Sequence, residues 1–126
     1  MLLSLDPSES SISIRAVFTD RVLLGSGLSC AHSFLLDRQR GLRAWPLAPG
    51  PDLQADDLLP LLALQPDLVL LGTGSRQIFP APALVALALG RGIGLEVMDN
   101  AAAARTFNVL LSEGREVLLA MRLPTP

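Results

Sequence analysis

A short buried strand followed by a glycine turn constrains this chain more than any other feature. Residues 68–71 read Leu-Val-Leu-Leu, an uninterrupted apolar run that is typical of a strand covered on both faces. The run ends abruptly in Gly72-Thr73-Gly74. Because such a strand lies inside a sheet with helices on both sides, the neighbouring sequence is expected to supply those helices.

The second half of the chain meets this expectation. Residues 67–121 alternate strand-length apolar runs with longer segments of helical spacing, which predicts β-α-β-α-β with right-handed crossovers. Asp99 is placed to cap the second of these helices, and Gly114 to end it. The predicted elements are strands over 68–71, 93–97 and 116–121, separated by helices over 81–89 and 100–112.

The first half contains short apolar segments divided by polar or glycine turns. In residues 12–18 every second residue is apolar at Ile12, Ile14, Ala16 and Phe18, the period of a half-buried strand. Further strands are expected over 22–24, 31–36 and 42–45, and a helix over 57–64. We therefore predict an α/β fold in which an N-terminal antiparallel β-meander leads into a mixed, largely parallel sheet covered by about three helices.

Length favours one domain. The 126 residues match an ordinary single domain, and the proline-rich connection at 46–51 is too short to separate two halves that are each too small for a core. We predict a single domain over residues 1–126, with flexible ends at 1–11 and 123–126.

Charge and hydropathy exclude two classes of protein. The net charge is −2 and the ten basic residues, all arginine, are scattered, so no nucleic-acid footprint is present. The most apolar region, residues 58–71, is interrupted by Pro60, Pro66 and Asp67, which excludes a transmembrane span of ~20 residues. Residues 1–6 lack the pattern of a signal peptide, and the single Cys30 fits a reducing compartment, so a cytoplasmic location is expected.

The high apolar content nevertheless points to contacts beyond the domain. Half of the residues are hydrophobic and the mean hydropathy is +0.45, values that are high for a small monomer. They indicate either a very buried sheet or an exposed patch that binds a protein partner or a second copy. Peripheral contact with a membrane complex stays open.

The glycine turn is the leading candidate ligand site. If the strands at 68–71 and 93–97 are parallel neighbours, the turn lies beside the start of the helix at 100–112. Glycine permits a close ligand approach and helix N-termini attract anions. The turn lacks a dinucleotide or P-loop fingerprint, so a purely structural turn is the preferred interpretation. The candidate ligand-binding residues are Gly72, Thr73, Gly74, Arg76, Asp99 and Asn100.

No set of residues predicts catalysis, a metal or a cofactor. Cys30 and His32 are the only cysteine and histidine, and on one strand they face the same side. A nucleophile and base need a third group to orient them, and metal sites need three or four ligands, so ordinary packing is favoured for both residues.

Five short motifs of the second half form one pattern: Gly72-Thr73-Gly74, Glu96-Val97-Met98-Asp99, Ala104-Arg105-Thr106, Asn108-Val109-Leu110 and Glu113-Gly114-Arg115. With a weaker match in the first half, they resemble a small family of conserved α/β proteins that includes the mitochondrial complex I assembly factor 3. The resemblance covers roughly residues 12–123 and implies a compact α/β domain without established catalysis. For the mitochondrial relative it implies association during respiratory complex assembly. Phe107 stands where the family commonly has tyrosine.

Two functions are consistent with these observations. The preferred hypothesis is a non-enzymatic protein-binding or assembly-factor-like module, with a link to respiratory complex assembly as the resemblance suggests. The alternative is a small-anion or nucleotide-binding enzyme that uses the Gly72-Thr73-Gly74 edge.

Overall fold

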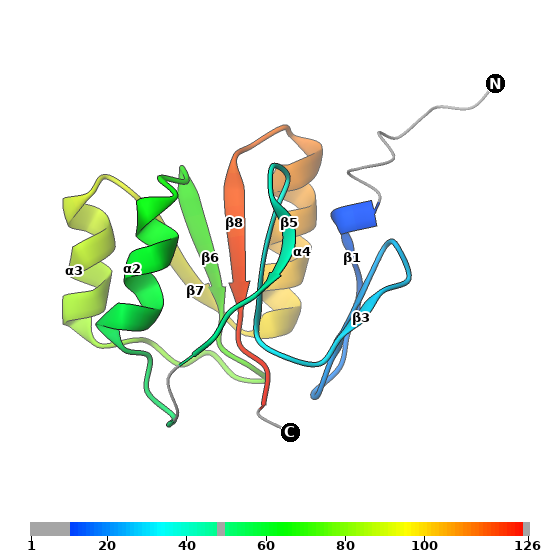
Figure 1. Cartoon of the computed structure of the whole chain (residues 1–126), viewed down its shortest axis with the longest axis horizontal. Coiled ribbons are helices and arrows are strands. Elements are labelled where there is room, and N and C mark those ends of the chain that lie inside the picture. The colour runs from blue at the N-terminus through cyan, green and yellow to red at the C-terminus, as the bar shows by residue number, and fades with distance from the viewer. Residues whose placement is uncertain (1–10, 48–49, 125–126) are drawn as a thin grey trace.

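A computed structural model describes residues 11–47 and 50–124, which form two sheets and their covering helices (Figure 1). The smaller sheet is antiparallel and has the strand order β1-β2-β3. The larger sheet has the order β5-β4-β8-β6-β7. The predicted α/β class is confirmed. The strands are β1 (Ile14–Val17), β2 (Val22–Leu24), β3 (Ser29–Cys30), β4 (Phe34–Asp37), β5 (Gly41–Ala44), β6 (Leu68–Gly72), β7 (Gly94–Met98) and β8 (Val117–Met121).

Strand β8 joins the two halves of the larger sheet. It pairs in parallel with β6 on one side and antiparallel with β4 on the other, so the sheet is mixed. All five residues of β8 are buried, as expected for a strand with neighbours on both edges and helices on both faces. β7 pairs with β6 in parallel and forms one edge of the sheet, while β5 forms the other.

The predicted meander is divided between the two sheets. The chain leaves the smaller sheet after Cys30 and enters the larger one at Phe34, so the strand expected over 31–36 begins later than predicted. The apolar side chains of the smaller sheet, including Val22 and Leu24, pack in the same core as Phe107 of the helix between the sheets. Apolar alternation predicts a strand, but it does not specify which sheet the strand joins.

Helices cover both faces of the larger sheet (Figure 1). α2 (Ala55–Ala63) and α3 (Pro82–Gly90) pack on one face, and α4 (Asn100–Ser112) packs on the other, between the two sheets. α4 has the predicted bounds, and the Asp99 carboxylate accepts a hydrogen bond of 2.8 Å from the Ala102 N–H. Within the ranges described, no helix combines the length and apolar character needed to span a bilayer.

Trp45 anchors the connection into α2, and a proline lies within that helix. Trp45 is buried, and its indole N–H donates to the Asp57 carbonyl oxygen at 3.1 Å. Pro60 lies inside α2 on its exposed face, beyond the first turn in which a proline is best tolerated. Water can reach the backbone carbonyl that a proline leaves without a donor on an exposed face.

The predicted flexible ends fall largely outside the described residues, namely 1–10 and 125–126. Leu123 is buried, and its N–H donates to Ser33 Oγ at 2.9 Å.

Candidate functional site

The carboxyl ends of β6 and β7 bring the six candidate ligand residues to one edge of the larger sheet. β6 ends at Gly72 and β7 ends at Met98, side by side in a parallel pair. The Thr73 N–H donates to the Met98 carbonyl oxygen at 2.9 Å, which fixes the first residue of the loop against β7. Asn100 opens α4 at the same edge. The predicted proximity of the glycine turn and the start of α4 is therefore present.

Asn100 makes hydrogen bonds to two other segments at this edge. Its side chain is buried, and its Oδ1 accepts a hydrogen bond of 3.0 Å from the Gly74 N–H. Its Nδ2 donates to the carbonyl oxygen of Arg122, just beyond β8, at 2.8 Å. The Asn100 N–H also donates to the Gly74 carbonyl oxygen at 2.8 Å. Asn100 therefore ties the glycine turn to the residue after the central strand.

The two glycines of the turn are required for different reasons. At Gly72, a Cβ atom would overlap Asn100 Oδ1, so glycine is needed for close approach of that side chain. At Gly74, a Cβ atom would meet nothing, but φ is +104°, a conformation that other residues rarely adopt. Both observations are consistent with the structural role that was preferred for the turn.

Thr73 holds the remainder of the loop. Its hydroxyl donates to the Arg76 carbonyl oxygen at 2.6 Å and accepts from the Ile78 N–H at 3.0 Å. The Gln77 side chain donates to the Val97 carbonyl oxygen of β7 at 2.8 Å. These bonds fasten residues 73–78 to the sheet edge at both ends of the loop.

Arg76 differs from the other candidates. Its side chain makes no hydrogen bond or ion pair with the described residues, and it lines a hollow of about 390 Å³ together with Thr19, Ser75 and Arg122. A neighbouring hollow of about 250 Å³ is lined by Asp99 and Asn100. The turn therefore separates two concave surfaces, although its own polar groups bind one another.

Ile78 lines the larger of these hollows and Phe18 the smaller, and neither was among the predicted site residues. Ile78, the last residue of the fastened loop, is 55% exposed, and Phe79, the next residue, is 69% exposed. Phe18 lies in the turn after β1, with the Arg21 guanidinium 4.2 Å from its ring centroid. An available sequence signal was the pair Ile78-Phe79 directly before Pro80, where apolar residues occur outside any predicted helix or strand.

Two of the motif residues, Thr106 and Asn108, make contacts within the domain. Asn108 donates to the Ile14 carbonyl oxygen and accepts from the Ile14 N–H, both at 2.8 Å, and this attaches β1 to α4. The Thr106 hydroxyl lies 3.5 Å from the Met98 sulfur. Arg105, Glu113 and Arg115 are exposed and lie away from the glycine turn along α4 and the loop after it.

Cys30 and His32 do not form a catalytic pair in the described structure. The Cys30 thiol lies 3.4 Å from the His32 backbone carbonyl oxygen, while the imidazole is exposed. Residues 11–47 and 50–124 contain no group of three or more histidine, cysteine or acidic side chains placed to hold a metal ion.

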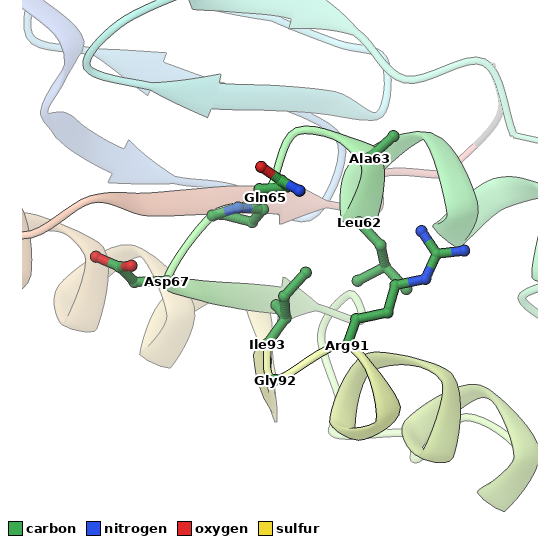
Figure 2. Close-up of a pocket in the computed structure, with 8 residues that line it drawn as sticks. Leu62, Ala63, Gln65, Asp67, Arg91, Gly92 and Ile93 are labelled. Atoms are coloured by element: carbon green, nitrogen blue, oxygen red, sulfur yellow. The ribbon is translucent and has the colours of Figure 1, made fainter.

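A further hollow lies at the opposite end of β6 (Figure 2). It has a volume of about 390 Å³ and is lined by the ends of α2 and α3 and the residues before β6. Arg91 extends toward α2, whereas the carboxylate of Asp67 points away from it (Figure 2). Gln65 has a φ of +53° where the chain leaves α2. The hollow brings no acid and base together, and the sequence analysis did not predict it.

Residues 14–122 match the family model described as a protein of unknown function, DUF498/DUF598. The chain belongs to this DUF498/DUF598 family. The family match covers both sheets and all of the glycine-turn edge.

Solved structures of similar proteins share the fold. A Xanthomonas campestris protein solved by NMR is 41% identical, with a TM-score of 0.79 over 98% of this chain and 92% of that one. An Mth938-like domain from Bordetella pertussis is 25% identical, with a TM-score of 0.70 over 97% of this chain and 92% of that one.

A "13 kDa major membrane protein" of Francisella tularensis is 32% identical over 57 residues, which is 45% of this chain and 46% of that protein. The matched region spans about half the length of the curated relatives.

Proposed function

We propose that this DUF498/DUF598 protein is a non-enzymatic binding module that holds a protein partner at the loop after β6. The observation that carries the proposal is a fastened loop with apolar side chains facing solvent. The Thr73 N–H and the Gln77 side chain bind the loop to β7, and Phe79, which directly follows residues 73–78, is 69% exposed. A large apolar group presented on an ordered loop loses little conformational entropy on binding.

The resemblance to the family of the complex I assembly factor supports a class of partner. A subunit of a respiratory complex, met at the membrane surface, is the partner that this resemblance favours. We propose a cytoplasmic location for the module, because its single cysteine, Cys30, fits a reducing compartment.

Affinity capture from extract of the source cells, followed by mass spectrometry, tests this function. Phe79→Ser and Leu89→Ser form a matched pair, because Leu89 is 65% exposed on α3. We expect the wild type and Leu89→Ser to retain one partner, and Phe79→Ser to bind the purified partner at least about tenfold more weakly. Equal binding by all three proteins, or no retained protein, would contradict the proposal.

A second function rests on the side chain of Arg76. An arginine without a partner in the described structure lines a hollow of about 390 Å³, which favours a small anion or a nucleotide. Against it, the Gly74 and Ile78 N–H groups already bond to Asn100 and Thr73, so the turn has fewer donors for a ligand. A saturable rise in Tm with phosphate, sulfate or nucleotide that Arg76→Ala abolishes would establish this function instead.

A further inference from the structure

The outer edge of β7 has backbone groups that no described residue binds. In a strand, alternate residues direct their N–H and C=O groups to opposite edges. The Gly94 N–H donates to the Asp67 carbonyl oxygen, and the Met98 carbonyl oxygen accepts from the Thr73 N–H. Gly94, Glu96 and Met98 therefore direct their backbone N–H and C=O groups toward β6. Leu95 and Val97 therefore direct their backbone groups outward.

The two ends of this edge are closed by other parts of the chain. The Ile93 N–H donates to the Ala88 carbonyl oxygen of α3 at 3.0 Å. The Gln77 side chain occupies the Val97 carbonyl oxygen. Within β7, the N–H and C=O of Leu95 and the N–H of Val97 are left to pair with another strand. An exposed sheet edge of this kind is a template for a further strand.

Glu96 gives the open edge its chemical preference. It lies between the two outward residues, its side chain is exposed, and its carboxylate forms no ion pair in the part of the chain that the structure describes. A residue paired opposite Glu96 would place its Cβ atom about 5 Å away on the same face. A basic side chain is favoured there and an acidic one disfavoured.

A second copy of the chain fits this edge less well. Two β7 strands paired about Glu96 would place their two carboxylates opposite each other. The Gln77 side chains of both copies would also occupy both Val97 oxygens, which removes two hydrogen bonds from the ladder. A charged edge residue commonly protects a sheet from self-pairing in this way.

We propose that β7 is the docking edge for an extended segment of a partner protein that carries a lysine or arginine opposite Glu96. This inference rests on the proposed function and names the chemistry of its partner. Gln77 fastens the loop that carries Phe79 to the outer edge of β7, so we expect one bound segment to contact both the backbone edge and this loop.

Synthetic peptides test the edge without knowledge of the partner. The lysine peptide is acetyl-Thr-Thr-Val-Lys-Val-Thr-Thr-amide, in which the valines face the side of Leu95 and Val97 when lysine faces Glu96. The glutamate peptide replaces lysine with glutamate. The proline peptide replaces both valines with proline, which removes backbone donors. Binding is measured from the amide resonances of ¹⁵N-labelled protein.

We expect the lysine peptide to shift the amide resonances of Leu95 and Val97 saturably, and the proline peptide to leave them unchanged. The glutamate peptide should bind about fivefold more weakly than the lysine peptide. Glu96→Lys should reverse the order of the two, a result that a purely structural role of Glu96 would not give. Glu96→Gln, which keeps the shape, should remove the preference.

Three outcomes would overturn the inference. These are shifts confined to other strands, an order of peptides that Glu96→Lys leaves unchanged, and a wild-type dimer that protects the amides of Leu95 and Val97. The proposed function can survive any of them, because its own test compares Phe79→Ser with Leu89→Ser. If Phe79→Ser loses the partner while the peptides do not bind β7, the protein is still a binding module, and the partner contacts the loop alone.

Discussion

The carboxyl end of β6 and the outer edge of β7 are neighbours that use their polar groups in different ways. At the end of β6, the amide of Asn100 and the hydroxyl of Thr73 bind backbone groups of the same edge. Along β7, the carboxylate of Glu96, the backbone N–H and C=O of Leu95 and the N–H of Val97 have no partner in the described residues, whereas the Val97 carbonyl oxygen binds Gln77. The residue types that most suggest chemistry thus maintain the shape of the loop, and the edge that we propose as the binding surface lies beside them.

Substitution of Gly72 should produce the largest effect on stability. A Cβ atom at this position would overlap Asn100 Oδ1. The side-chain amide of Asn100 is held by two hydrogen bonds, one at Oδ1 and one at Nδ2, and cannot move without breaking them. We expect Gly72→Ala to lower the free energy of unfolding by about 3 kcal/mol. Chemical denaturation measures this, with Gly90→Ala as the control, since a Cβ atom at Gly90 meets nothing within 4 Å.

Asn100→Ala should come next, at about 2 kcal/mol, because it leaves the Gly74 N–H and the Arg122 carbonyl without their partner. The two substitutions should not be additive. With the amide removed, Gly72→Ala has nothing to overlap and should cost about 1 kcal/mol or less. Full additivity in a double-mutant cycle would show that the two residues act separately. It would contradict the explanation that glycine is needed at residue 72 because Asn100 approaches it closely.

Thr73→Val tests whether the fastened loop supports binding. The change keeps the shape of the side chain but removes the bonds to Arg76 and Ile78, at an expected cost of about 1 kcal/mol. A less ordered loop should also weaken the affinity for the captured partner, whereas Thr73→Ser should restore both properties. Calorimetry and a binding titration of the three proteins check this; unchanged affinity in Thr73→Val would separate loop order from binding.

Phe79→Ser should have the smallest effect on stability, within about 0.5 kcal/mol of the wild type, because the ring is 69% exposed. The same variant is expected to lose the partner. A substantial fall in Tm would instead mean that Phe79 packs against the domain. Its side chain would then stabilise the fold, as Asn100 does at the end of β6, and would not be free to bind a partner.

Much of the fold could be predicted from local patterns. The bounds of α4 follow from the cap at Asp99 and the glycine at residue 114, and the buried β6 follows from its continuous apolar run. The division of the first half between two sheets could not be predicted, because Phe34 and Val22 have equally apolar surroundings in the sequence. The single domain over 1–126 stays a prediction, to be checked by one thermal transition.

The sequence predicted where the candidate site lies but not the hydrogen bonds that form in it. Residue type and topology placed Asn100 beside the glycine turn. They did not indicate that its amide would bond to the residue after β8, since that contact depends on tertiary structure across 22 positions. The open edge of β7 has no local sequence signal either, because edge position is a property of strand order.

The position of β8 also has a consequence for the newly made chain. It is synthesised after every other described strand, yet it lies between β4 and β6. Until Val117 to Met121 leave the ribosome, the two earlier parts of the sheet share no neighbour, and their inner edges are exposed. A polypeptide that stops short of Val117 would keep these edges unpaired, which makes it prone to aggregation and a target for chaperones and proteases.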